Sequence, residues 1–163
     1  MRTKPITRFG IWALLVVFGG VSLGETGCST KTPKYPEDHE RFQRVVQAIK
    51  TLETAYVNKD IAAFHGLLLP LEQLEILETK VQQDFSTFAT IQVDLTIDRL
   101  VINESRISAF ISWQGTWQRS AQESRVESSG HGVLLWSGTQ VILLRGVEGD
   151  LPFGITSRLS LPS

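Results

Sequence analysis

Apolar and polar residues alternate through much of the second half of this 163-residue chain. From Ile91 to Ile97 every second residue is aliphatic, the residues between them are polar, and residues 107–113 largely repeat the pattern. A period of two puts the apolar side chains on one face of a β-strand and the polar side chains on the other. We therefore expect the segment from Ile91 to Val147 to form antiparallel strands with one apolar face that needs a cover.

Turn residues divide this segment into separate strands. Gly130 and Gly132 flank His131 and indicate a bulge or a strong bend within one of them. The last residues, 146–163, are rich in glycine, proline and serine, and we expect them to trail along the sheet edge. The strands are expected at about 90–102, 107–119, 123–136 and 141–144.

The first half of the domain has apolar residues at helical spacing. A first helix is predicted with Asp38 as its N-cap, an apolar stripe from Phe42 to Tyr56 and an end near Asn58. A short second helix follows, and a third begins at about Pro70. Amphipathic helices of this length need an apolar surface to pack on, and the sheet supplies one. The predicted fold class is α+β, with N-terminal helices packed on an antiparallel sheet.

The beginning of the chain has the layout of a secretory signal peptide. Basic residues precede an apolar run at 9–18 that is shorter than a membrane span. The run leads to Gly27 and Cys28, which resemble the end of a bacterial lipoprotein signal, although Glu25 stands where that family has an aliphatic residue. The resemblance implies that residues 1–27 are removed and that Cys28 carries a lipid. An uncleaved membrane anchor and an unlipidated secreted protein are the alternatives.

The charge of the chain bears on which classes of partner it can bind. Removal of residues 1–27 takes three of the 16 basic and one of the 17 acidic residues, which leaves 13 and 16 and a formal charge of −3. This mild acidity argues against nucleic-acid binding and against a polybasic membrane surface, so the lipid remains as the membrane contact. Residues 28–37, polar and proline-bearing, are predicted to be a linker. Cys28 is the one cysteine in the sequence, so an intrachain disulfide is impossible.

The order of elements and the stretch from Ala55 to Phe64 resemble the nuclear-transport-factor-2-like superfamily, which includes the ketosteroid isomerases. The stretch looks like that superfamily's joint between the first and second helices, and the resemblance covers roughly 42–153. It implies a domain at 38–155 and a C-terminal tail at 156–163. It also implies a strongly bent, cone-shaped, cystatin-like sheet that curls around the first helix and encloses an apolar pocket.

The resemblance also directs attention to Tyr56. The ketosteroid isomerases use a tyrosine on the first helix as a hydrogen-bond donor and an aspartate on a short strand after the second helix as a base. Tyr56 lies on the matching helix, but residues 67–71 contain no acid. Asp94 and Asp98 share a strand face, and it is the polar one, so we expect both to face solvent.

Four large aromatic residues are candidates for lining a pocket, although filling a core is the simpler role for them. The three histidines lack the spacing of a metal site, and no catalytic residue, metal or cofactor is predicted. The predicted function is a non-catalytic, lipid-anchored cell-envelope domain that faces the periplasm or the exterior and binds a protein partner or a small apolar ligand. An isomerase or lyase that uses Tyr56 and His131, and a homodimer formed through the outer sheet face, are the alternatives. The pocket candidates are Tyr56, Trp113, Trp117 and Trp136.

Overall fold

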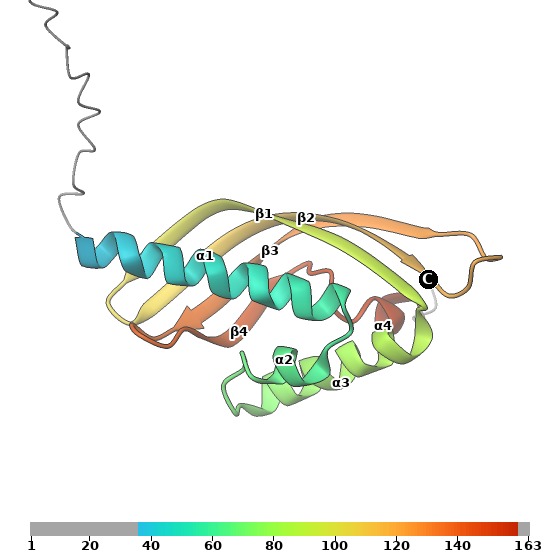
Figure 1. The fold of residues 1–163 in the computed structure, drawn as a ribbon, viewed down its shortest axis with the longest axis horizontal. Helices are drawn as coiled ribbons and strands as arrows, with labels where there is room; N and C mark the ends of the chain where they lie inside the picture. Colours follow the sequence, from blue (N-terminus) through green and yellow to red (C-terminus); the bar gives the residue numbers. More distant parts are fainter. Residues whose placement is uncertain (1–35, 160–163) are drawn as a thin grey trace, which may run out of the picture. The chain divides into compact units, whose positions relative to one another are not determined.

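The computed structural model describes residues 36–159, and Cys28 with the predicted signal peptide lies outside this range. Three helices come first, then four strands, and a short helix ends the described chain (Figure 1). The helices are α1 (Pro36–Val57), α2 (Ile61–His65), α3 (Glu72–Thr87) and α4 (Ile155–Leu159), and the strands are β1 (Thr90–Asn103), β2 (Arg106–Gln118), β3 (Val126–Ser137) and β4 (Leu143–Gly149).

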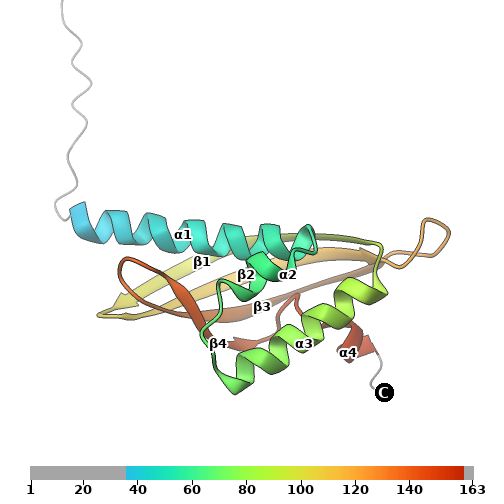
Figure 2. The same ribbon diagram turned by 60° about the horizontal axis from the view of Figure 1, so that its bottom comes forward.

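The four strands form one antiparallel sheet in the order β1-β2-β3-β4, in which each strand pairs with the next along the chain. The pairing shifts by a residue between Ile97 and Arg99 in β1 and between Leu135 and Trp136 in β3. Such irregularities increase the twist and bend of a sheet. The sheet curves over the helices, which lie on its inner face (Figures 1 and 2). The predicted α+β class with helices on a bent antiparallel sheet is therefore confirmed.

The core lies between the inner sheet face and the helices. Residues of α1, α2 and α3 that recur every three to four positions meet the inner residues of the strands, which recur every two. Burial of each large side chain contributes roughly 1.5–3 kcal/mol relative to its exposure. The largest fully buried side chains are Trp117, Trp136, Tyr56, Phe64, Phe88, Leu52, Leu74, Ile107, Ile111, Leu134, Leu144 and Val45.

Several element boundaries differ from the sequence-based expectations. Helix α1 begins at Pro36 rather than after Asp38. Proline suits the first turn of a helix, because the N–H that it lacks would have no partner within the helix there. Strand β4 extends to Gly149 instead of ending at residue 144. Residues 155–159, at the beginning of the expected tail, form helix α4. Among residues 36–159, no helix has the length and hydropathy to cross a membrane.

Strand β1 is an edge strand, and α1 runs beside it. Glu53 on α1 is only 7% exposed, and its carboxylate accepts a hydrogen bond of 3.4 Å from the backbone N–H of Leu95. Lys50 donates to the same carboxylate at 2.5 Å. The acid is therefore paired on both sides, which makes its burial against the sheet tolerable.

Candidate functional site

Three fully buried polar side chains converge inside the domain, each from a different element. The indole N–H of Trp117 on β2 donates to the hydroxyl of Tyr56 on α1 at 3.0 Å. That hydroxyl in turn donates to Oδ2 of Asp84 on α3 at 2.6 Å. The three residues have no exposed surface, so this chain of hydrogen bonds is shielded from water.

Local periodicity places each of these side chains. Tyr56 ends the buried stripe of α1, and Trp117 follows the inward alternation of β2. Asp84 lies three positions after Val81 and so falls on the buried stripe of α3, below Leu77. Asp84 was not predicted from the sequence, although it continues the spacing of the buried residues at 74, 77 and 81. An acid on an apolar stripe was the signal that would have found it.

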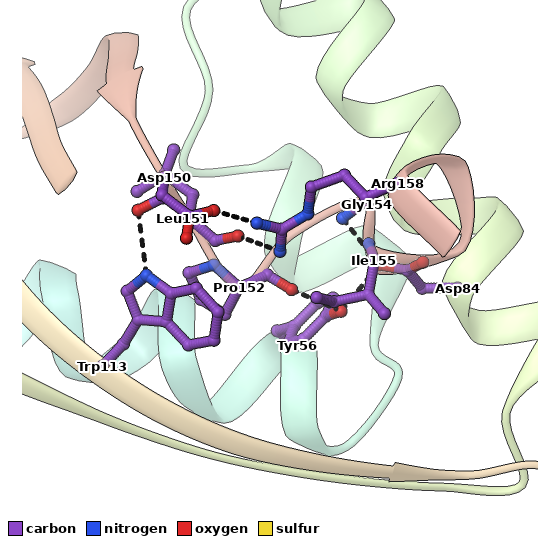
Figure 3. Close-up of polar contacts among 9 residues, drawn as sticks. All are labelled: Tyr56, Asp84, Trp113, Asp150, Leu151, Pro152, Gly154, Ile155 and Arg158. Atoms are coloured by element: carbon purple, nitrogen blue, oxygen red, sulfur yellow. Dashed lines mark hydrogen bonds and ion pairs between the residues drawn. The ribbon is translucent and has the colours of Figure 1, made fainter. Parts of the chain in front are cut away.

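The residues from Asp150 to Leu159, which we call the C-terminal segment, occupy the space next to this chain of hydrogen bonds (Figure 3). Oδ2 of Asp84 accepts from the backbone N–H groups of Gly154 at 2.6 Å and Ile155 at 3.1 Å. Its Oδ1 accepts from the N–H of Thr156 at 2.8 Å. The buried carboxylate thus satisfies the free N–H groups at the beginning of α4.

The carbonyl groups of the C-terminal segment are also held by side chains. The Tyr56 hydroxyl lies 3.0 Å from the carbonyl oxygen of Pro152, a second acceptor for its proton. The indole N–H of Trp113 donates to the carbonyl oxygen of Asp150 at 2.9 Å. Arg158 turns back to pair with the Asp150 carboxylate and to donate to the Leu151 carbonyl at 2.5 Å (Figure 3).

Apolar side chains of the segment fill the remaining interior. Leu151, Phe153 and Ile155 are all less than 9% exposed. The ring of Phe153 meets Tyr56 edge-to-face at 5.0 Å and Phe64 at 5.6 Å between ring centroids. The interior that the fold encloses is therefore occupied by the chain itself.

The environment of Tyr56 determines what its hydroxyl can do. Burial raises the pKa of this phenol far above its ordinary value, and the neighbouring Asp84 carboxylate raises that pKa further. The phenol therefore stays protonated at physiological pH and acts as a hydrogen-bond donor. Asp84 receives four donors in all, from one side chain and three backbone groups.

The four aromatic pocket candidates do not form one group. Tyr56 and Trp117 are hydrogen-bonded, and Trp113 meets Trp117 edge-to-face at 6.1 Å. Trp136 pairs across the sheet with Ile107 and Leu144, away from these three. All four are buried, and a role in ligand binding stays a prediction.

Open depressions lie instead on the outer sheet face. The larger has a volume of about 590 Å³ and is lined by polar side chains that include Asp94, Gln114 and Glu127. The neighbouring one has a volume of about 490 Å³ and is lined by residues that include His131 and Trp113. Asp94 and Asp98 are exposed, as expected. Within residues 36–159, no three His, Cys, Asp or Glu side chains are grouped so that they could hold a metal ion.

An ion pair between α2 and α3 gives a prediction about pH. Nδ1 of His65 lies 2.8 Å from Oε2 of Glu78, and this hydrogen bond, with the charge of Glu78, raises the pKa of His65. A raised pKa in the folded state stabilises the fold below the unfolded-state pKa of histidine, and this contribution is lost as the pH rises through the raised pKa. The stability lost in Glu78→Gln, measured by urea unfolding, is therefore expected to be larger at pH 6 than at pH 9. An equal loss of stability at pH 6 and pH 9 would contradict this prediction.

Comparison with known proteins gives a consistent fold and little sequence similarity. No protein-family model matches the chain, and no curated protein matches it either. Among solved structures, a conserved protein from Planctomyces limnophilus superposes with a TM-score of 0.58 at 15% identity, covering 66% of this chain and 93% of that one. A nuclear-transport-factor-2-like superfamily protein from Salmonella enterica gives 0.58 at 13% identity, covering 72% and 96%. A hexachlorocyclohexane dehydrochlorinase gives 0.58 at 6% identity, covering 72% and 89%.

These structural neighbours agree with the architecture described above. The domain has the nuclear-transport-factor-2-like fold, with helices on a curled antiparallel sheet. The predicted resemblance to that superfamily is therefore confirmed at the level of fold. At these identities the likeness concerns the fold alone, since one fold carries many functions.

Proposed function

We propose that this chain is a lipid-anchored cell-envelope protein whose domain is a non-catalytic binding module. The non-catalytic part of this proposal rests on the contacts that Asp84 and Tyr56 make. Both groups lie in the interior, where an enzyme of this fold would hold its substrate, and both are engaged by the chain's own C-terminal segment.

Acid–base catalysis requires a titratable group within hydrogen-bond reach of the substrate. Asp84 is fully buried, and both of its oxygens accept from the C-terminal segment. The raised pKa of Tyr56 suits a structural donor and not a base. Asp94 and Glu127 lie exposed on the outer face, outside the interior that the sheet and helices enclose.

One observation favours the alternative, a small-molecule isomerase or lyase. A buried phenol donates to a buried carboxylate at 2.6 Å, and a structural neighbour is a dehydrochlorinase. Activity assays with carbonyl and halogenated small molecules distinguish the two proposals, with Asp84→Asn as the negative control. Turnover that this substitution abolishes, in a protein that remains folded, would replace the non-catalytic proposal.

The anchoring part rests on Cys28, and membrane fractionation tests it. In a bacterial host the unaltered chain is expected in the membrane fraction and to resist a high-salt wash, because a lipid holds it there. Cys28→Ser removes the acceptor of the lipid, so it is expected to move the protein to the soluble fraction. Ser29→Ala, one residue further on, is the matched control and is expected to stay with the membrane. Retention of Cys28→Ser would instead favour an uncleaved anchor.

Binding through the outer sheet face is the remaining proposal for a partner. The partner proposed for this face is a second copy of the chain, and sedimentation tests whether that homodimer forms. A monomer that persists at high protein concentration would count against a homodimer.

A further inference from the structure

The beginning of α1, the β1–β2 turn and the β3–β4 turn lie at one end of the domain (Figures 1 and 2). Arg41 donates to the carbonyl oxygen of Gly138 at 3.1 Å, and Arg44 donates to that of Thr139 at 3.0 Å. The N–H of Gly138 donates to the carbonyl oxygen of Ser105 at 3.1 Å. These contacts hold the three segments together, so they present one surface, which we call the α1 end.

Exposed apolar side chains are found at the α1 end. Val141 in the β3–β4 turn is 69% exposed. Phe42 in the second turn of α1 and Val101, two residues before the end of β1, are exposed as well. These are three of the six large apolar side chains that are exposed in residues 36–159. Gathered apolar groups with polar residues around them mark surfaces that meet a partner or a membrane.

The lipid proposed for Cys28 would hold this end close to a membrane. Cys28 and Pro36, where α1 begins, are eight positions apart, so the chain between them spans at most about 29 Å. The beginning of α1 therefore stays within that distance of the bilayer in every orientation of the domain. The other end of this 22-residue helix can lie about 33 Å further away. The α1 end is thus the part of the domain that the anchor keeps nearest to the lipid.

The charges at the α1 end indicate which part of a bilayer it suits. Glu37 and Asp38 lie in the first turn of α1, and Glu40 pairs with Arg44 at 3.5 Å. This acidity disfavours an anionic lipid surface. Residues 137–142, which carry Val141, include no charged residue, so an apolar contact with the interfacial region is open to them. A weak contact is sufficient, because the anchor gives the bilayer a high effective concentration.

We propose that the α1 end is a membrane-contact surface, on which Val141 enters the interfacial region of the bilayer that holds the lipid of Cys28. Phe42 and Val101 add apolar area at the same end. The proposal rests on the lipid anchor proposed above and gives the domain a second contact with that membrane. It also gives the domain an orientation, in which the β2–β3 turn at the opposite end faces away from the lipid (Figure 1).

Quenching of a fluorescent label by iodide tests the contact. The full chain carrying Gln140→Cys is purified from bacterial membranes, labelled with bimane and inserted into preformed phosphatidylcholine vesicles. Gln140 is exposed and adjoins Val141. Quenching is expected to be about fivefold weaker than in the same labelled chain with Cys28→Ser, which has no lipid. Gln122→Cys in the exposed β2–β3 turn is the control site, where the label is expected to be quenched equally in the two chains.

Two substitutions distinguish an apolar contact from mere closeness to the vesicle. Val141→Asp is expected to restore full quenching of the label at residue 140, because a charged side chain does not enter the apolar boundary. Ile76→Asp changes an exposed apolar residue on α3 and is expected to leave the protection unchanged. Protection that survives Val141→Asp, or equal quenching at residues 140 and 122 in the lipidated chain, would overturn the membrane contact and leave the anchor in place.

The number of reactive thiols separates these results from a failure of the anchor itself. Cys28 is the one cysteine of the natural sequence, and a lipid on its sulfur leaves the Gln140→Cys chain with a single site for the label. Labelling of Cys28 as well as residue 140 would show that Cys28 carries no lipid. That result would overturn the anchor, and the membrane contact with it.

Discussion

Replacement of Asp84 by alanine is expected to lower the free energy of unfolding by about 4 kcal/mol. The carboxylate accepts from the Tyr56 hydroxyl and from the N–H groups of Gly154, Ile155 and Thr156. Its removal takes the acceptor away from the buried N–H groups of Gly154 and Ile155, whereas the Tyr56 hydroxyl keeps the Pro152 carbonyl oxygen as an acceptor. It also removes the negative charge at the beginning of α4. Urea unfolding of the full chain at pH 7 measures the loss.

Two controls make this result specific. Asp84→Asn keeps the shape of the side chain and one acceptor oxygen, but its NH2 group faces groups that are themselves donors. A loss of about 2 kcal/mol in the free energy of unfolding is therefore expected. Asp94→Ala removes the same side chain from the exposed outer face, and a change within about 0.5 kcal/mol is expected. A loss in Asp84→Ala no greater than that in Asp94→Ala would show that the buried hydrogen bonds are not needed for stability.

Phe153→Ala is expected to destabilise the domain by a similar amount, about 4 kcal/mol. The ring is 5% exposed and packs edge-to-face on Tyr56 and Phe64, so its removal loses apolar burial and leaves a cavity between α1 and α2. Phe42→Ala on α1 is the matched control, because that ring is 40% exposed. Thermal and urea unfolding of the two variants measure the difference, and equal losses would contradict this account.

The two substitutions also test whether the C-terminal segment acts as a unit. Asp84 holds its backbone and Phe153 fills its seat, so either change alone loosens the same ten residues. Once the segment has detached, the second change has little left to remove. The loss in the double variant is therefore expected to be smaller than the sum of the single losses.

Local periodicity explains why the strands and the first three helices were predictable. The alternation from Ile91 to Ile97 and the stripe from Phe42 to Tyr56 each indicate which face is buried. The observed burial follows both patterns except at Phe42, which is 40% exposed. Proximity of Tyr56 to Trp113 and Trp117 was predictable because the resemblance in fold places the first helix against the inner sheet face. Their burial was foreseeable to the same extent, since each lies on an apolar stripe.

The C-terminal segment and Asp84 could not be assigned from local patterns. A helix of five residues such as α4 is unstable alone, and its first N–H groups are satisfied by an acid about 70 positions earlier in the chain. Propensity favours a loop for a stretch rich in glycine and proline, and tertiary contacts override it here. Trp136 was grouped with the other aromatics by residue type, whereas the strand register separates it.

The contact between Glu53 and the N–H of Leu95 has a consequence for association with other chains. An edge strand such as β1 offers a row of unpaired backbone groups to which a strand of another molecule can add, a common route to aggregation. The buried Glu53 carboxylate takes up one such group near the middle of the strand, and α1 stands beside it. A strand arriving at this edge would have to displace a charged side chain that is already paired with Lys50. The helix that completes the core thereby also protects a long exposed edge from unwanted β-pairing.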